Sequence, residues 1–163
     1  MDLLAVLQQL NIPYKTVDHE PVYTVAEAEI VDMPLKGEGC KSLFLTSVHE
    51  QDCVLACLPS EKKADLKRIA RVMGTTRLHF AGPELLQAKL NLVQGAVGPM
   101  GLINDVEHQV QVYIDADLAG SQLRMPANIT SRTIGLHYDD VLKFVKAMGN
   151  RVIVDFGEKI DVR

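Results

Sequence analysis

The chain of 163 residues carries a net charge of −4 and is 47% hydrophobic and 23% charged. This length and composition fit one globular domain with a core of its own. The acidic balance excludes a generic binder of polyanions, so any nucleic-acid contact has to use a local basic patch. An apolar run of about 18 residues is missing, which predicts that no helix spans a membrane.

The N-terminal segment and the cysteines indicate the compartment. The first ten residues have neither the basic segment nor the cleavage site of a signal peptide. The three cysteines form no CxxC pair and no His/Cys cluster with zinc-site spacing. We therefore expect a cytoplasmic protein in which Cys40, Cys53 and Cys57 are small core residues, with no metal and no cofactor.

The first sixty residues contain several predicted elements. Apolar residues at helical spacing predict a helix over residues 3–10, and an extended segment follows over 14–17. A capping-box pattern predicts a short helix over 24–33, which must end before a proline. Residues 39–47 and 53–59 flank a polar turn and predict a β-hairpin.

The rest of the chain mixes helices and strands. In chain order we predict a helix over 64–74, a strand over 77–80, a helix over 83–90, a turn-rich segment over 95–105, a strand over 109–118, a helix over 139–149 and a strand over 151–156. Because regular βαβ alternation is missing, the pattern favours an α+β domain with a mixed sheet over a doubly wound one.

One lysine interrupts the apolar strand predicted over 39–47. Strand alternation puts Lys41 on the same side as Leu43 and Leu45. From this segment alone, the lysine either extends outward from the end of the strand or lines a pocket that receives an anion. Generic catalytic motifs, such as GxSxG or a phosphate-binding glycine loop, are not found in the sequence.

Three short segments carry a further signal in their order and spacing. They are HEPVYT at residues 19–24, KSLFL at 41–45 and GAVGP at 95–99. Together they make the chain resemble YbaK-like proteins and prolyl-tRNA synthetase-associated editing domains, closest to the free-standing deacylases of Ala-tRNA(Pro). The resemblance implies a single editing domain over residues 1–163, with a mixed, mostly antiparallel sheet and flanking helices. The implied activity is hydrolysis of the ester of mischarged tRNA(Pro), as quality control of translation.

The resemblance places the catalytic residues at Lys41 and Gly95. Lys41 stands at the position of the family's essential lysine. Since lysine is charged at neutral pH, we expect it to hold phosphate or to stabilise an oxyanion and not to act as a base. In the family, the main chain of the loop that starts at Gly95 lies against the aminoacyl group. Since the sequence shows no Ser–His or Cys–His pair, we expect water to attack the ester directly.

Further residues are expected to bind the substrate. They are Ser42, Leu45, Ala96, Pro99, Met125 and Asn128. Leu45 and Ala96 are the expected walls of a pocket too small for proline, because size is what separates the wrong from the correct product. Two positions depart from the family pattern. Ser42 stands where many relatives have asparagine, and Met125 stands at the place of a histidine.

Basic residues concentrate around the helix predicted over 64–74. We expect a tRNA-binding face formed by Lys62, Lys63, Lys67, Arg68 and Arg71. The alternative is an ordinary solvated helix face. Aromatic residues make up 5% of the chain and tryptophan is missing, which argues against recognition of single strands by stacked aromatics.

The expected partner is tRNA, contacted at its aminoacylated 3′ end and acceptor stem. Prolyl-tRNA synthetase as a second partner stays open, and neither DNA nor a membrane is expected. Two alternative functions also remain. One is a deacylase of Cys-tRNA(Pro) or another mischarged tRNA. The other is a non-catalytic module of the same fold that binds tRNA or a synthetase. Met125 favours the module, whereas Lys41 and the GAVGP segment favour the enzyme.

Overall fold

The structure, a computed structural model, describes residues 2–21 and 35–157. Its α-helices are α1 (Leu3–Gln9), α3 (Leu66–Met73), α4 (Pro83–Leu90) and α5 (Tyr138–Ala147). Its strands are β1 (Lys15–Asp18), β2 (Glu38–Thr46), β3 (Cys53–Pro59), β4 (His79–Phe80), β5 (Val110–Asp115), β6 (Gln122–Pro126), β7 (Arg132–His137) and β8 (Val152–Asp155). Short 3₁₀ helices are η1 (Val48–Glu50), η2 (Pro99–Asn104) and η3 (Ala116–Leu118). The helix predicted over 24–33 lies outside the described residues.

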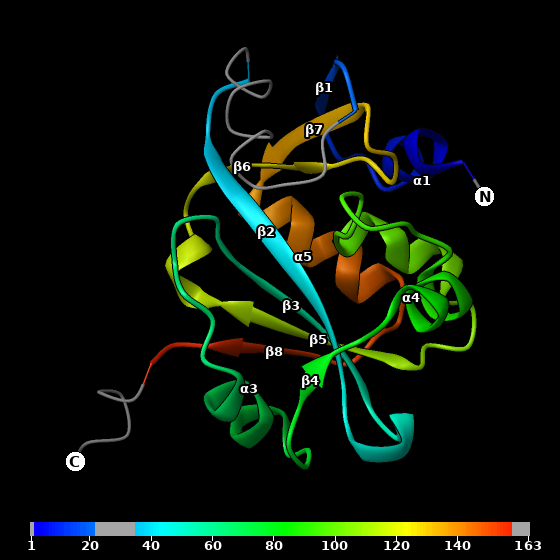
Figure 1. The fold of residues 1–163 in the computed structure, drawn as a ribbon. Coiled ribbons are helices and arrows are strands. Elements are labelled where there is room, and N and C mark those ends of the chain that lie inside the picture. Colours follow the sequence, from blue (N-terminus) through cyan, green and yellow to red (C-terminus); the bar gives the residue numbers. More distant parts are fainter. Residues whose placement is uncertain (1, 22–34, 158–163) are drawn as a thin grey trace.

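The strands form one sheet in the order β1-β7-β6-β2-β3-β5-β8, and β4 pairs with β2 (Figure 1). The pairs β1–β7, β6–β7, β2–β3 and β2–β4 are antiparallel, whereas β2–β6, β3–β5 and β5–β8 are parallel. Within the described residues, antiparallel pairings are therefore the majority. The predicted α+β fold with a mixed, mostly antiparallel sheet is confirmed.

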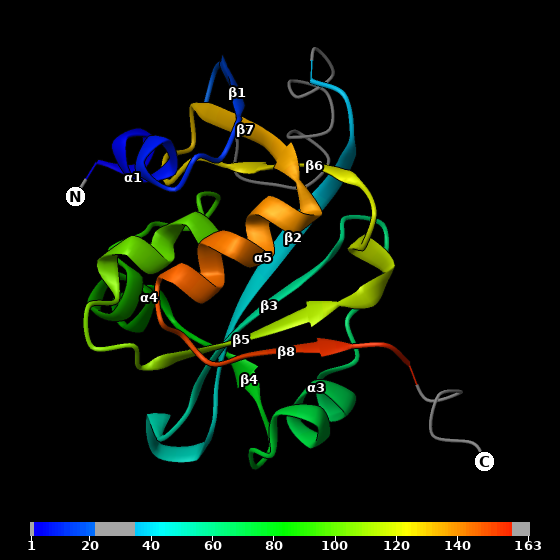
Figure 2. The same cartoon turned by 180° about the vertical axis from the view of Figure 1, so that it is seen from behind.

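Helices cover both faces of the central strands. On one face, Ile69 and Met73 of α3 pack against Leu45 and Val54. On the other face, α1, α4 and α5 form a larger core, and α5 crosses in front of the sheet in Figure 2. Because β2 and β3 are buried on both faces, their sequences read as nearly continuous apolar runs.

Local sequence signals explain where the helices begin and end. The Asp65 side chain caps α3 by accepting a hydrogen bond from the backbone N–H of Arg68 at 3.1 Å. Gly74 ends the same helix in a left-handed conformation, with φ of 74°. Pro83 occupies the first turn of α4, where its missing N–H costs nothing. None of the helices among the described residues is long and apolar enough to cross a membrane.

Most predicted elements within the described residues are confirmed, with their ends shifted by a few residues. Two strands were not predicted from the sequence, namely β6 and β7, which lie in a stretch without clear alternation. They matter for the site because β6 joins β2 to the outer part of the sheet. The turn-rich segment 95–105 contains η2, which packs beside α4 and α5.

Candidate active site

A pocket of about 500 Å³ lies along the open edge of β2, between β6 and β4. The start of β2, Glu38–Gly39, pairs with β6, and its end, Leu45–Thr46, pairs with β4. The other edge of β2 is paired with β3. Along the edge shared by β6 and β4, no described strand pairs with residues 40–43. Figure 1 shows β6 and β4 at the two ends of β2. The start of α4, the segment 94–97 and the β6–β7 turn complete the walls.

Lys41 lines the pocket from this unpaired stretch of β2. Its side chain is half-buried. The structure shows no hydrogen bond and no ion pair for its ammonium group within residues 2–21 and 35–157. A positive charge that lacks a carboxylate partner in a partly desolvated wall attracts an anionic ligand. Of the two interpretations of this lysine, the geometry therefore favours the anion-binding one.

Gly95 lines the same pocket and has φ of 92°. This left-handed conformation is one that glycine adopts without steric cost, so the residue type follows from the turn. The loop is closed by a hydrogen bond from the Ala96 N–H to the Val93 carbonyl at 3.0 Å. Ala96 and Pro99 are buried behind the loop and do not line the pocket, so they support the wall without forming it.

Ser42 and Met125, two of the residues expected to bind the substrate, both line the pocket. The Ser42 hydroxyl donates to Cys57 Sγ at 3.5 Å, so it is oriented toward the neighbouring strand β3. Met125 lies on β6 opposite Ile134 and is 1% exposed. The position where the resemblance led us to expect a histidine therefore contributes a buried thioether to the pocket.

The structure places Leu45 and Asn128 outside the lining of this pocket. Leu45 is fully buried beneath α3, against Ile69, because α3 covers the side of β2 toward which Leu45 points. Asn128 has a left-handed backbone in the β6–β7 turn, with φ of 72°, and its Nδ2 donates to the Met100 carbonyl at 3.1 Å. Asn128 therefore ties the β6–β7 turn to η2 and shapes the pocket from behind.

The structure brings together one pair of residues that sequence reasoning missed. His19 Nε2 lies 2.8 Å from Thr133 Oγ1, and His19 Nδ1 lies 2.8 Å from the Glu20 carbonyl. A carbonyl only accepts, so in the neutral imidazole Nδ1 carries the proton and Nε2 accepts from the Thr133 hydroxyl. Both side chains line the pocket. The signal in the sequence was the HEPVYT segment, but its partner on β7 lies more than a hundred residues away.

Cys40 also lines the pocket, and its thiol lies beside that of Cys57 on the adjacent strand. Hydrogen bonding to Cys57 and burial raise the pKa of Cys40 well above its ordinary value. A thiol that remains protonated is a poor nucleophile. Cys40, Cys53 and Cys57 are free and buried, as predicted. No group of three or more His, Cys, Asp or Glu side chains in the described part of the chain is suited to holding a metal.

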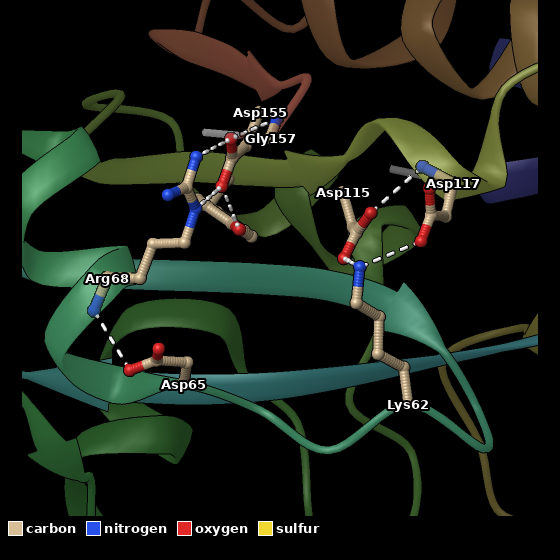
Figure 3. A network of polar contacts seen from close by, with 8 residues as sticks. Lys62, Asp65, Arg68, Asp115, Asp117, Asp155 and Gly157 are labelled. Carbon is tan, nitrogen blue, oxygen red and sulfur yellow. Dashed lines mark hydrogen bonds and ion pairs between the residues drawn. The ribbon is translucent and has the colours of Figure 1, made fainter. Parts of the chain in front are cut away.

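The basic residues around α3 do not form one continuous set of exposed charges. Lys62 Nζ lies 2.7 Å from Asp115 and 2.8 Å from Asp117, and these two carboxylates raise the pKa of Lys62 (Figure 3). Arg68 binds Asp155 with two hydrogen bonds of 2.7 Å. The charges of Lys62 and Arg68 are therefore paired with carboxylates of the same chain, at the surface for Lys62 and in a partly buried place for Arg68.

Asp155 is the centre of this second network. The Arg68 guanidinium, and then the Tyr113 hydroxyl donating at 2.6 Å, hold the pKa of Asp155 well below its usual range. Burial and the neighbouring carboxylate raise the pKa of Tyr113.

Three of the predicted tRNA-binding residues are exposed and lie outside the ion pairs that Lys62 and Arg68 form. They are Lys63, Lys67 and Arg71.

Comparisons with known proteins agree with the geometry. A family model described as "Aminoacyl-tRNA editing domain" matches residues 19–144. The "Prolyl-tRNA editing protein ProX" of Acetoanaerobium sticklandii is 38% identical over 149 residues, which is 91% of each chain. The "Prolyl-tRNA synthetase associated domain-containing protein 1" of Danio rerio is 29% identical over 143 residues, covering 86% of this chain and 77% of that one.

A solved structure described as a candidate trans-editing enzyme for prolyl-tRNA synthetase has the same fold. Its TM-score is 0.71, and each chain covers 95% of the other at 20% sequence identity. At this level of identity the likeness concerns the fold alone.

Proposed function

Because the chain belongs to the aminoacyl-tRNA editing domain family, we propose that residues 1–163 form a single editing domain that hydrolyses Ala-tRNA(Pro). The observation that carries the proposal is that Lys41 lies in one pocket with the glycine loop at Gly95, and that its ammonium has no hydrogen bond or ion pair with the residues that the structure describes. An aminoacyl ester at the 3′ end of tRNA brings phosphates and a carbonyl that becomes negatively charged on attack. A fixed positive charge in a pocket stabilises both.

Lys41 and the loop divide the work in this proposal. Lys41 holds phosphate or the developing oxyanion as a point charge. The left-handed turn at Gly95 exposes main-chain groups against which the aminoacyl group and the attacking water are positioned. Water adds to the carbonyl carbon, the ester C–O bond breaks, and the ribose oxygen leaves with a proton. The products are free alanine and uncharged tRNA.

The pair formed by His19 and Thr133 raises the question of a covalent intermediate. A hydroxyl hydrogen-bonded to an oriented imidazole is the arrangement of an activated nucleophile. Thr133, however, is 3% exposed and lies within β7, so it offers little open surface to an ester carbonyl although it lines the pocket. In our proposal water attacks directly, and this pair fixes one wall of the pocket.

Selection of the amino acid depends on the part of the pocket beside Met125. This buried thioether makes the wall apolar, and a hydroxyl without a partner there is costly. We therefore place alanine ahead of serine, with cysteine as a secondary substrate. Proline is rejected by size, because Met125 and the Gly95 loop restrict the room beside the ester.

The proposed partners follow from the substrate. They are the aminoacylated 3′ end and the acceptor stem of tRNA in the cytoplasm, with Lys63 and Lys67 as candidate contacts to phosphates. Association with prolyl-tRNA synthetase would deliver the mischarged product directly.

Deacylation of purified aminoacyl-tRNAs tests the proposal. Ala-, Ser-, Cys- and Pro-tRNA(Pro) are incubated separately with the protein, and the remaining ester is followed over time. We expect rapid loss of Ala-tRNA(Pro), slower loss of the Ser and Cys forms, and a background rate for Pro-tRNA(Pro). Equal rates for alanine and proline would contradict selection by size, and background rates for all four would leave the non-catalytic module as the better interpretation.

A further inference from the structure

One exposed aromatic side chain stands at the rim of the pocket. Phe80 is the second residue of β4 and pairs with Leu45 of β2. The next residue, Ala81, donates its N–H to the Phe44 carbonyl at 3.0 Å, so the backbone on both sides of the ring is fixed. The side chain is nevertheless 60% exposed and lines the pocket.

A single exposed apolar side chain needs no explanation, but Phe80 is not isolated. Ile129, in the β6–β7 turn, is also exposed and lines the same pocket. By contrast Phe156, at 62% exposure, lies beside the Arg68–Asp155 network and does not line the pocket. Two phenylalanines of equal exposure therefore differ in one respect, which is their position relative to the pocket.

The pocket has room for more than an amino acid. A volume of about 500 Å³ lies within the range of roughly 300–1,000 Å³ found for sites that hold drug-sized ligands. An alanyl group occupies a small part of such a space. In an aminoacyl-tRNA the ester is attached to the terminal ribose, so the terminal base is the group that enters next to it.

We propose that Phe80 forms a subsite for the terminal nucleobase of the tRNA and stacks on it through its ring. This inference rests on the proposed function. Lys41 lies four residues before Leu45, the partner of Phe80, which corresponds to about 13 Å along the strand. The ester is held near Lys41 and the Gly95 loop, and the base extends along the open edge of β2 toward β4.

This subsite contributes affinity and not amino-acid selection. Stacking on an aromatic face is available to every base, so it secures the 3′ end whatever amino acid is attached. The low aromatic content argues against recognition of a single strand by several stacked side chains. One terminal base needs only one aromatic ring, and Phe80 provides it at the rim of the pocket. Loss of such a ring weakens binding roughly 5- to 150-fold.

The experiment measures binding of an acceptor-stem minihelix of tRNA(Pro) that carries alanine through a non-hydrolysable amide. Two forms are compared, one with the terminal adenine and one with an abasic terminal nucleotide. For the adenine form we expect Phe80→Ala to raise Kd at least fivefold, Phe80→Leu to raise it nearly as much, and Phe80→Tyr to leave it within twofold of wild type. Phe156→Ala is the matched control and should bind as wild type does.

The abasic form isolates the base contact. We expect wild type and Phe80→Ala to bind it with equal Kd, because the partner of the ring is missing. An equal loss on both forms, or no loss on either, would overturn the stacking assignment while leaving the proposed function intact. If the wild-type protein binds neither form and also fails to deacylate Ala-tRNA(Pro), the proposed function fails, and the base subsite fails with it.

Discussion

Two regions of the molecule place basic side chains beside a hollow, and they treat the positive charge in opposite ways. In the pocket along β2, Lys41 lines the wall without a carboxylate partner in the described part of the chain. In the smaller hollow beside α3, Lys62 and Arg68 are bound by Asp115, Asp117 and Asp155. The charges of the second region are paired within the protein, whereas Lys41 has no such pair within residues 2–21 and 35–157 and can receive an anion.

The difference shows that residues distant in sequence decide whether a basic side chain can bind an external anion. A carboxylate brought close by the fold occupies the charge. Arg68 and Lys62 are close to Lys63 and Lys67 in sequence and look equivalent in a basic helix. The carboxylates that neutralise them come from β5, η3 and β8, which follow far along the chain. A partnered guanidinium would have to give up its internal hydrogen bonds to reach a phosphate, and this cost removes most of the gain.

The largest expected effect comes from removing the positive charge of Lys41. Lys41→Ala should lower the rate of Ala-tRNA(Pro) deacylation at least about 100-fold, because the loss of a group that stabilises an oxyanion typically costs about 3 kcal/mol. The free energy of unfolding should change by less than ~0.5 kcal/mol, since the half-buried ammonium forms no hydrogen bond or ion pair with the described residues. Single-turnover deacylation and urea unfolding measure the two quantities.

Lys67→Ala is the control for the Lys41 substitution, since it removes the same charge from an exposed site on α3. Its rate at saturating protein should stay within twofold of wild type. A Lys41→Ala protein that deacylates at the wild-type rate would show that the unpartnered charge does not serve catalysis.

The next prediction compares two buried apolar residues, of which only one lines the pocket. Leu45→Ala should lower the free energy of unfolding by about 3 kcal/mol, because it opens a cavity beneath α3. It should leave the ratio of Ala- to Pro-tRNA(Pro) deacylation unchanged, since Leu45 does not line the pocket. Urea unfolding and the two deacylation rates, measured on the same preparation, test both statements.

Met125→Ala is the matched partner of that substitution. Met125 is as deeply buried as Leu45, so its truncation should destabilise the fold by a similar amount. Because Met125 lines the pocket, only this variant should raise hydrolysis of Pro-tRNA(Pro) relative to Ala-tRNA(Pro). The reverse result, with selectivity changed by Leu45→Ala alone, would place the amino-acid site on the α3 side of the sheet.

The case of Leu45 shows how far the sequence predicted the site. Strand alternation correctly put Lys41 and Leu45 on one side of β2, and the hairpin with β3 is confirmed. The pocket, however, opens at the edge of the strand and not over its face. Its position depends on β6 and β4 both pairing with that edge, which the local pattern of β2 does not encode.

Two strands that were not predicted, β6 and β7, explain most of the features of the site that the sequence did not reveal. β6 contains the buried Arg124, whose Nε donates to the Gly37 carbonyl at 2.9 Å, and β7 contains Gly135 in its middle. Neither stretch alternates cleanly between apolar and polar residues. The contact between His19 and Thr133 depends on β7, so it was hidden for the same reason.

A smaller effect is expected from removing the Asp155 carboxylate from its network with Arg68. Asp155→Asn should lower the free energy of unfolding at pH 7 by about 2 kcal/mol, because it removes the carboxylate that accepts two hydrogen bonds from the partly buried Arg68. The folded-state pKa of Asp155 is depressed, so its stabilisation is present at neutral pH and is lost as pH falls below about 4. The wild type should therefore lose stability more steeply than Asp155→Asn between pH 5 and pH 3.

Asp117→Asn is the control in the same network. The Asp117 carboxylate is 69% exposed, and Lys62 keeps Asp115 as a partner when it is removed. An exposed ion pair contributes about 0–1 kcal/mol, so the unfolding curve should barely move. Parallel pH profiles for wild type and Asp155→Asn would show that Asp155 does not carry the acid sensitivity.

The smallest expected effect concerns the exposed lysines that have no carboxylate partner in the described part of the chain. Reversing both charges in Lys63→Glu/Lys67→Glu should weaken tRNA binding by less than about tenfold at physiological salt. If each lysine contacts one phosphate, the slope of log K against log salt should become shallower by roughly 1.5 to 2, because fewer counterions are released on binding. Lys146→Glu on α5, which reverses one exposed charge away from α3, should lower affinity without this loss of slope. An unchanged slope in the double variant would mean that Lys63 and Lys67 do not contact the phosphates of the tRNA and are ordinary solvated surface residues.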